Sequence, residues 1–290
     1  MSPINHFPKD NFFMVFLKFV RATDVDNRLC DQLRDSFTRF FRSGGRTNME
    51  TQPTAPPAGE EDAKYSLQFS DQSIRSRFVA KVFTLVTIMF IVVTIMCAMP
   101  FIFPPFKRWI QQNWVFFLVS ICVFIVTSIV LLCCSSVRRS YPANLITLGI
   151  FTLASGYMTM STTSFYNVES VLLALCITTG VSAAIVVFAI YIKKDLTTLI
   201  GIVYILGMTM LFFGITATIS VLAFRVTFLY TVYAVLGALL SMLYLAIDIQ
   251  LIMGGRRFEL SPEEYIFASM QIFLDILNIF LFMLRIFGSR

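Results

Sequence analysis

Residues 265–287 read YIFASMQIFLDILNIFLFMLRIF, and this stretch decides the fold. It is long enough to cross a bilayer as a helix, because a span needs roughly 20 predominantly apolar residues. Asp275 lies about ten residues into it, which is roughly 15 Å of helical rise. An aspartate at such a depth costs about 2.5–3.5 kcal/mol on insertion scales, so Asp275 must face protein or water. The stretch therefore predicts an inner helix that other helices surround.

The polar side chains of this stretch fall on one face of the predicted helix. Their spacing alternates between four and three residues, as helical periodicity requires. The stripe runs through Glu264, Ala268, Gln271, Asp275, Asn278, Phe282 and Arg285. A polar stripe along most of a span favours a place at the centre of a bundle.

Further apolar runs precede this one along the chain. They cover about residues 82–103, 115–134, 143–163, 168–191, 198–222 and 226–252. Hydrophobic residues make up 57% of the chain and charged residues 14%, whereas soluble domains carry roughly 25% charged residues. Backbone groups in hydrocarbon must be bonded within the spanning structure, and runs of this length favour helices over a closed barrel. We therefore expect an all-α polytopic membrane protein with seven transmembrane helices, the last of them central.

Basic residues flank the predicted spans unevenly. On one side lie Arg75, Arg77, Lys81, Arg138, Arg139, Lys193, Lys194, Arg256 and Arg257; on the other lie Lys107, Arg108, Arg225, Arg285 and Arg290. The positive-inside rule then places the amino terminus in the cytoplasm and the carboxyl terminus outside or in a lumen. The net charge of +6 reflects this topology, since the basic residues form no continuous face for nucleic acid.

The first part of the chain differs in composition from the rest. We expect residues 1–73 to form a cytoplasmic, largely disordered tail and residues 74–290 to form the membrane domain. Residues 51–62 (TQPTAPPAGEED) have the composition of a disordered linker. Residues 11–20 (NFFMVFLKFV) are too short for a span, and they predict an interfacial helix or an unusual amino-terminal extension.

A second aspartate, Asp248, lies near the cytoplasmic end of the sixth predicted span. Gly237, Ser241 and Tyr244 share its helix face, and the small residues permit close approach of a neighbour. We expect this face to meet the polar stripe of the seventh span. Asp248 and Asp275 would then resist simultaneous ionisation and titrate as a pair, which makes them a candidate pH sensor and ion path. The alternative is that each aspartate only hydrogen-bonds a neighbouring helix.

Arg138, at the cytoplasmic end of the second predicted span, is a candidate counter-charge. An ionised aspartate pair would hold it and a protonated pair would release it, which is a two-state latch. The alternative is that Arg138 and Arg139 serve topology alone.

The same region offers ligands for a weak, exchangeable Ca²⁺ site. Ca²⁺ takes about 6–8 oxygen ligands, and Asp248 and Asp275 with Asn278, Tyr244 and waters would supply them weakly. Weak sites suit permeation better than storage. Gln271 adds a further polar side chain on the stripe. We expect Ca²⁺ as a permeant ion and no cofactor.

Histidine and suitably spaced cysteines, which many enzyme and metal sites use, are scarce in the sequence. The only histidine is His6, and the six cysteines show neither a disulfide framework nor zinc spacing. An intramembrane aspartyl protease also needs two aspartates, but its usual Gly-x-Gly-Asp context is missing around Asp248 and Asp275. A seven-helix receptor is opposed by the charge asymmetry and by the lack of Asp-Arg-Tyr and Asn-Pro-x-x-Tyr signals. We therefore do not expect an enzyme.

Several longer motifs resemble the Bax-inhibitor-motif membrane proteins, and within them the Lifeguard branch. They are Ile74-Arg-Ser-Arg-Phe-Val-Ala-Lys-Val82, Cys133-Cys-Ser-Ser-Val-Arg-Arg-Ser-Tyr-Pro-Ala-Asn144, Ala154-Ser-Gly-Tyr-Met158, Gln250-Leu-Ile-Met-Gly-Gly255, Ser261-Pro-Glu-Glu-Tyr-Ile-Phe267 and Leu274-Asp-Ile-Leu-Asn278. The resemblance implies a seven-helix fold with a central last helix, a pH-responsive Ca²⁺ leak across intracellular membranes, and suppression of apoptosis. The endoplasmic reticulum and the Golgi are the membranes it favours, with the plasma membrane and the endolysosome as alternatives.

The resemblance also assigns roles to single residues. The paired aspartates of the family match Asp248 and Asp275, and its latch arginine matches Arg138. The chain departs from the family in having Ile247-Asp-Ile-Gln250 where Tyr-Asp-Thr-Gln is usual, which removes a hydroxyl beside the sensor. Family members are also described as binding death-pathway or channel proteins. A non-conducting membrane scaffold for such proteins therefore remains the main alternative to a channel.

Overall fold

The computed structural model describes residues 60–224, 228–255 and 260–289, and within them seven helices are long and apolar enough to cross a membrane. These are α3 (Glu60–Ile102), α5 (Trp114–Cys133), α7 (Ala143–Thr163), α8 (Val168–Tyr191), α9 (Ile200–Phe224), α10 (Phe228–Met253) and α11 (Tyr265–Phe287). Short helices join some of them: α4 (Pro104–Gln112), α6 (Ser135–Arg139), η1 (Leu196–Leu199) and η2 (Pro262–Glu264). No strand occurs in the described ranges, so the predicted all-α class is confirmed.

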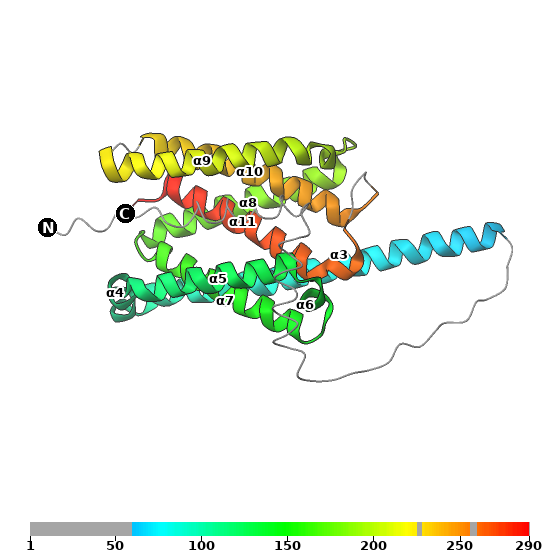
Figure 1. The fold of residues 1–290 in the computed structure, drawn as a ribbon, viewed down its shortest axis with the longest axis horizontal. Coiled ribbons are helices and arrows are strands. Elements are labelled where there is room, and N and C mark those ends of the chain that lie inside the picture. Colours follow the sequence, from blue (N-terminus) through cyan, green and yellow to red (C-terminus); the bar gives the residue numbers. More distant parts are fainter. Residues whose placement is uncertain (1–59, 225–227, 256–259, 290) are drawn as a thin grey trace.

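The last helix, α11, lies at the centre of the bundle (Figure 1). The helices α3, α5 and α7 pack together on one side of it, and α8, α9 and α10 pack together on the other. Within its most apolar stretch 89% of α11 is buried, against 67% for α10 and at most 56% for any other span. The predicted central position of the last helix is therefore confirmed.

Aromatic side chains on α11 join the two halves of the bundle. The ring of Phe273 has its centroid 4.9 Å from that of Phe90 in α3 and 6.1 Å from that of Phe151 in α7. Nearer the other end of α11, Phe282 meets Tyr233 of α10 edge-on, with centroids 5.8 Å apart. Such ring pairs contribute about 0.5–1.5 kcal/mol beyond the area they bury. Between helices in lipid, packing of this kind replaces the hydrophobic effect as the driving force.

The first spanning helix begins earlier than the sequence suggested. Residues 60–73, expected as part of the largely disordered tail, are helical and continue α3 beyond the end of the bundle (Figure 1). No glycine or proline occurs between Gly59 and Pro100, so a helix formed in the span can extend toward its amino terminus at low cost. The expectations for residues 1–59, including the interfacial helix at 11–20, fall outside the described residues.

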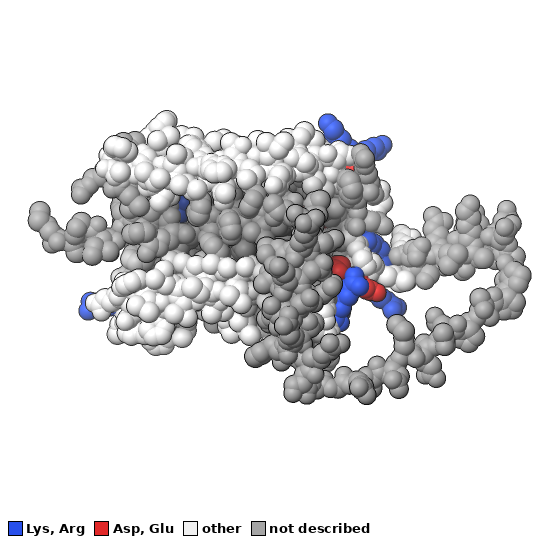
Figure 2. Space-filling model, viewed as in Figure 1, with Lys and Arg blue, Asp and Glu red and all other residues white. Residues whose placement is uncertain are grey.

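The short elements distinguish two ends of the bundle. We refer to the end that carries α6 and η2 as the α6 end, and to the end that carries α4 and the turn between α7 and α8 as the α4 end (Figure 1). Charged side chains gather toward these ends in the view of Figure 2, and most of the described surface visible between them is white. Its exposed side chains include Ile91, Val126, Leu153 and Ile205, as a lipid-facing surface requires. The sequence predicts that the α6 end is cytoplasmic.

Candidate functional site

Asp275 and Asp248 are both buried in the interior of the bundle. Asp275 is 0% exposed and Asp248 is 2% exposed. They lie on α11 and α10, which pack against each other more extensively than any other pair of helices. Counted from the α6 end, Asp275 lies about 15 Å along α11 and Asp248 about 7.5 Å along α10, at 1.5 Å per residue. The structure therefore places both predicted carboxylates in the half of the interior nearer the α6 end.

The close approach of α10 and α11 depends on Gly237. A β-carbon at this position would overlap the ring of Phe282 on α11. Phe282 is itself fully buried, and Ser241, one turn beyond Gly237, is buried as well. The prediction that the small residues on the Asp248 face let α10 meet α11 is confirmed.

The supporting polar residues separate into two groups. Gln271 and Asn278 are buried on α11, on either side of Asp275. Tyr244 instead donates its hydroxyl to the carbonyl of Val203 in α9, at 3.2 Å. It lies against Gly207, where the missing side chain of the glycine leaves room for the phenol. The Tyr244 hydroxyl thus bonds the backbone of α9 as well as lying on the α10 helix that carries Asp248.

α8 contributes polar atoms that sequence reasoning did not select. Thr178 and Ser182 are buried, and α8 packs against α10 and α11. Among the described residues, neither hydroxyl oxygen has a hydrogen-bond partner, and the same holds for Oδ1 of Asn278. Buried polar atoms are normally hydrogen-bonded to protein or to ordered water, so these atoms mark a part of the interior whose chemistry suits water. The four-residue spacing of Ser170, Ala174, Thr178 and Ser182 was the signal that could have revealed this face.

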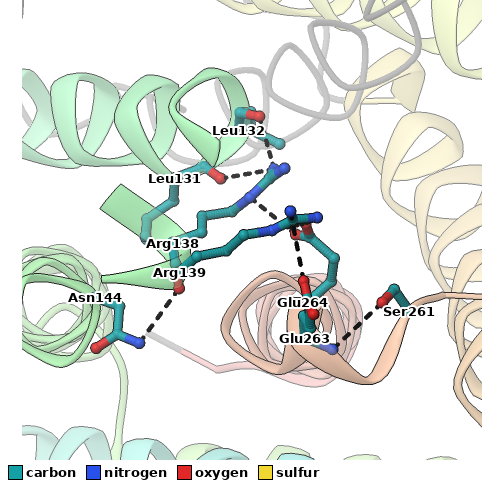
Figure 3. Close-up of polar contacts among 8 residues, drawn as sticks. All are labelled: Leu131, Leu132, Arg138, Arg139, Asn144, Ser261, Glu263 and Glu264. Carbon is teal, nitrogen blue, oxygen red and sulfur yellow. Dashed lines mark hydrogen bonds and ion pairs between the residues drawn. The ribbon is translucent and has the colours of Figure 1, made fainter. Parts of the chain in front are cut away.

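Arg138 lies at the α6 end and pairs with Glu264 (Figure 3). Its Nε is 2.9 Å from Oε2 of Glu264, and the two side chains are 13% and 12% exposed. Its Nη1 donates to the carbonyls of Leu131 and Leu132 at 3.2 and 2.8 Å, so the cation also meets the negative end of the α5 dipole. Sequence reasoning assigned Arg138 to the aspartates. Glu264 is its carboxylate partner here because α6 lies at the end of the bundle, whereas Asp275 lies about 15 Å along α11 from that end.

Further contacts connect this ion pair to the neighbouring helices. Arg139 places Nη2 3.1 Å from Oε1 of Glu264, so one carboxylate holds two arginines. Asn144 on α7 donates to the hydroxyl of Tyr265 at 2.8 Å. Lys81 on α3 places its Nζ 3.3 Å from the centroid of the Tyr265 ring, a cation–π contact. Side chains from α3, α6, α7, η2 and the start of α11 thus form one charged cluster at the α6 end.

Two side chains at the α6 end, those of Arg75 and Gln250, bond backbone groups of residues far away in the chain. Arg75 donates to the carbonyls of Leu251 at 2.9 Å and Leu260 at 2.7 Å, on either side of the loop after α10. Its guanidinium lies against Gly254, whose φ of +73° is a conformation that glycine adopts readily. Gln250 holds the loop after α8, since it accepts from the amide of the first η1 residue at 2.8 Å.

The described residues contain no group of three or more His, Cys, Asp or Glu side chains that could hold a metal ion.

The family described as "Inhibitor of apoptosis-promoting Bax1" matches residues 75–290, the range that holds every residue of this site. The chain belongs to this family. Two relatives named Protein lifeguard 3, from Homo sapiens and Mus musculus, are also similar to this chain in sequence. Each is 35% identical over 223 residues, which cover 77% of this chain and 72% of the relative.

A third relative comes from a different organism. Bax inhibitor 1 of Schizosaccharomyces pombe is 28% identical over 217 residues, which cover 75% of this chain and 78% of the relative. The resemblance to Bax-inhibitor-motif proteins of the Lifeguard branch is therefore confirmed. The chain is an integral multi-pass membrane protein.

Proposed function

We propose that the chain is a pH-sensitive Ca²⁺ leak channel, or a regulator of intracellular Ca²⁺, in organelle membranes. The observation that carries the proposal is the complete burial of Asp275 in the middle of the most buried helix, with Asp248 buried on the helix packed against it. Acidic residues inside a membrane are costly and mark ion paths or proton relays. The endoplasmic reticulum or the Golgi is the proposed location, with the plasma membrane or the endolysosome as alternatives.

A second part of the proposal is that the chain is a negative regulator of apoptosis. Its support is the description of the family as inhibitors of apoptosis-promoting Bax1 and the name of the relative Bax inhibitor 1. Leak of Ca²⁺ from a store is the physical link we propose between the buried aspartates and this role.

The polar atoms around α11 support an ion path through the bundle. Thr178, Ser182 and Asn278 present buried oxygens that suit water, on helices packed around the aspartates. A hydrated Ca²⁺ would exchange some of its waters for these oxygens and for the carboxylates of Asp248 and Asp275. Few strong ligands keep the ion weakly bound, which permits its release.

The ion pair at the α6 end suggests how protons would gate this path. Arg138 has one carboxylate partner in Glu264 and, in our proposal, a competing one in the ionised aspartate pair, with Asp248 nearer in depth. Protonation of the pair removes its attraction for Arg138, whereas ionisation restores it. Two further cations adjoin this ion pair, since Arg139 shares Glu264 with Arg138 and Lys81 lies against the Tyr265 ring.

The test is Ca²⁺ efflux from proteoliposomes that contain the purified full chain, measured from about pH 6 to pH 8. The wild type should leak with a rate that depends on pH. Asp248→Asn and Asp275→Asn should each abolish the leak or make it independent of pH. Glu169→Gln is the matched control, because this carboxylate is exposed in the first turn of α8 and should not alter the profile. An ionophore added at the end shows that all vesicles were loaded.

The same variants separate the channel from the scaffold alternative. If the wild type shows no leak at any pH, the channel is excluded and a scaffold for death-pathway or channel proteins is the better account. Cells that express the Asp248→Asn, Asp275→Asn double variant should then be challenged with a death stimulus. Protection that survives the loss of both carboxylates would also argue for a scaffold, whereas its loss would connect protection to the aspartates.

A further inference from the structure

A polar pocket lies at the α4 end of the bundle, the end remote from Arg138. It has a volume of about 380 Å³ and lies between α4 and the turn that joins α7 to α8. α4 lines it with Lys107, Arg108, Gln111 and Gln112, and the turn lines it with residues 164–167. Among the described residues, the lining offers two cations, amides and hydroxyls, and no carboxylate.

The helix that carries the two cations has the features of an interfacial helix. Its polar residues share one side, and its other side carries Phe106, Trp109 and the buried Ile110. The rings of Phe106 and Trp109 stack with centroids 6.0 Å apart, and Trp109 contacts Phe116 of α5 at 5.0 Å. Trp109 and Phe116 are nonetheless exposed, as aromatic residues at the headgroup level of a membrane are. An interfacial helix of this kind would place the pocket at the depth of lipid headgroups.

The positions of Lys107 and Arg108 call for an explanation other than topology. They lie at the end of the bundle opposite Arg138 and Arg139, where the positive-inside rule leaves few basic residues. The pocket is also preformed, because Gln111 donates to the carbonyl of Ser164 at 2.8 Å and so ties α4 to the turn. Lys107 is half-buried, with its Nζ 5.1 Å from the centroid of the Phe101 ring.

We propose that this pocket binds the headgroup of an anionic phospholipid whose phosphate carries a neutral polyol, such as glycerol or inositol. Lys107 and Arg108 would pair with the phosphate oxygens. The side-chain amides of Gln112 and Asn167, which can donate and accept, would bond the hydroxyls of the polyol. The described lining residues include no carboxylate to pair with the ammonium group of ethanolamine or serine lipids, and choline lipids carry no net negative charge for Lys107 and Arg108.

The test uses the two tryptophans of the chain, Trp109 and Trp114, which lie on α4 and at the start of α5. Lipids with brominated acyl chains quench a tryptophan that they contact. The purified full chain is reconstituted in mixtures of phosphatidylglycerol and phosphatidylcholine in which one or the other lipid is brominated. Brominated phosphatidylglycerol should quench at a lower mole fraction than brominated phosphatidylcholine. Brominated phosphatidylserine, which has the same net charge, should quench less well than phosphatidylglycerol.

The Lys107→Gln, Arg108→Gln double variant leaves both tryptophans in place and removes the two charges. Its preference for phosphatidylglycerol should fall by roughly thirtyfold, about fivefold for each charge lost near a membrane surface. The matched control is Lys193→Gln, Lys194→Gln, which removes two exposed charges at the α6 end and should keep the preference. Unchanged selectivity in the Lys107→Gln, Arg108→Gln variant would overturn the proposal. Loss of lipid selectivity on adding inorganic phosphate at matched ionic strength would show a general phosphate site and overturn the lipid assignment.

Discussion

Replacing Gly237 by alanine tests whether α10 and α11 pack as closely as the contact between Gly237 and Phe282 indicates. The new β-carbon would lie 2.8 Å from Cε2 of Phe282 and closer still to two other ring atoms, whereas carbon atoms in contact prefer about 3.5–4.0 Å. Phe282 has no exposed surface, so its ring cannot move into solvent or lipid. The helices must separate or the ring must leave its rotamer. Overpacking of this kind costs about 1–3 kcal/mol.

The matched control is Gly180→Ala on α8, where a β-carbon would have no atom within 4 Å. Both substitutions gain the same intrinsic helix propensity, about 1 kcal/mol, so their difference isolates the overpacking. The midpoint of thermal unfolding in detergent should be lower for Gly237→Ala than for Gly180→Ala. At about 2–4 °C for each kcal/mol, the expected difference is about 2–12 °C.

A second variant distinguishes the Phe282 contact from any other cause. Phe282→Leu removes part of the ring that the new methyl group would meet. Gly237→Ala combined with Phe282→Leu should therefore lose less stability than the sum of the two single changes. Equal midpoints for Gly237→Ala and Gly180→Ala, or strictly additive losses in the double variant, would refute the close approach of α10 and α11 at this point.

Further predictions concern the α6 end and the contact with α9. Glu264→Gln should lower the free energy of unfolding by about 3 kcal/mol, since it leaves the nearly buried Arg138 without its charge partner. The side chain of Glu263 is 69% exposed, so Glu263→Gln should cost less than about 1 kcal/mol. The reverse order in denaturation would contradict the pairing. Gln250→Leu should cost about 1–3 kcal/mol and speed hydrogen exchange in the loop after α8, because the amide that it holds loses its acceptor. Tyr244→Phe should lower the free energy of unfolding by about 1 kcal/mol in denaturation, because the hydrogen bond from its hydroxyl to Val203 in α9 is lost. An unchanged stability would contradict this contact.

The burial of Asp275 could be predicted because an aspartate that faces hydrocarbon costs free energy. An exposed Asp275 would face hydrocarbon at a depth of about 15 Å, so its place in the sequence already required protein or water around it. The same cost favours a central position for α11, where other helices surround Asp275. The partner of Arg138 could not be predicted in this way, because polar residues at a helix end meet water and headgroups at little cost. Glu264 and the aspartates all offer Arg138 a carboxylate, and only the position of α6 at the end of the bundle decided between them.

The sequence by itself determined the helical class, the seven spans and the interior position of Asp275, because hydrocarbon imposes one requirement on every residue at a given depth. The tertiary structure decided which side chains meet. It directed Tyr244 to Val203 in α9, paired Arg138 with Glu264 and built the pocket beside Lys107. Such contacts join residues far apart in the chain through distances of about 3 Å. Helical periodicity specifies the face on which a residue lies, and only the packing of the helices specifies what that face touches.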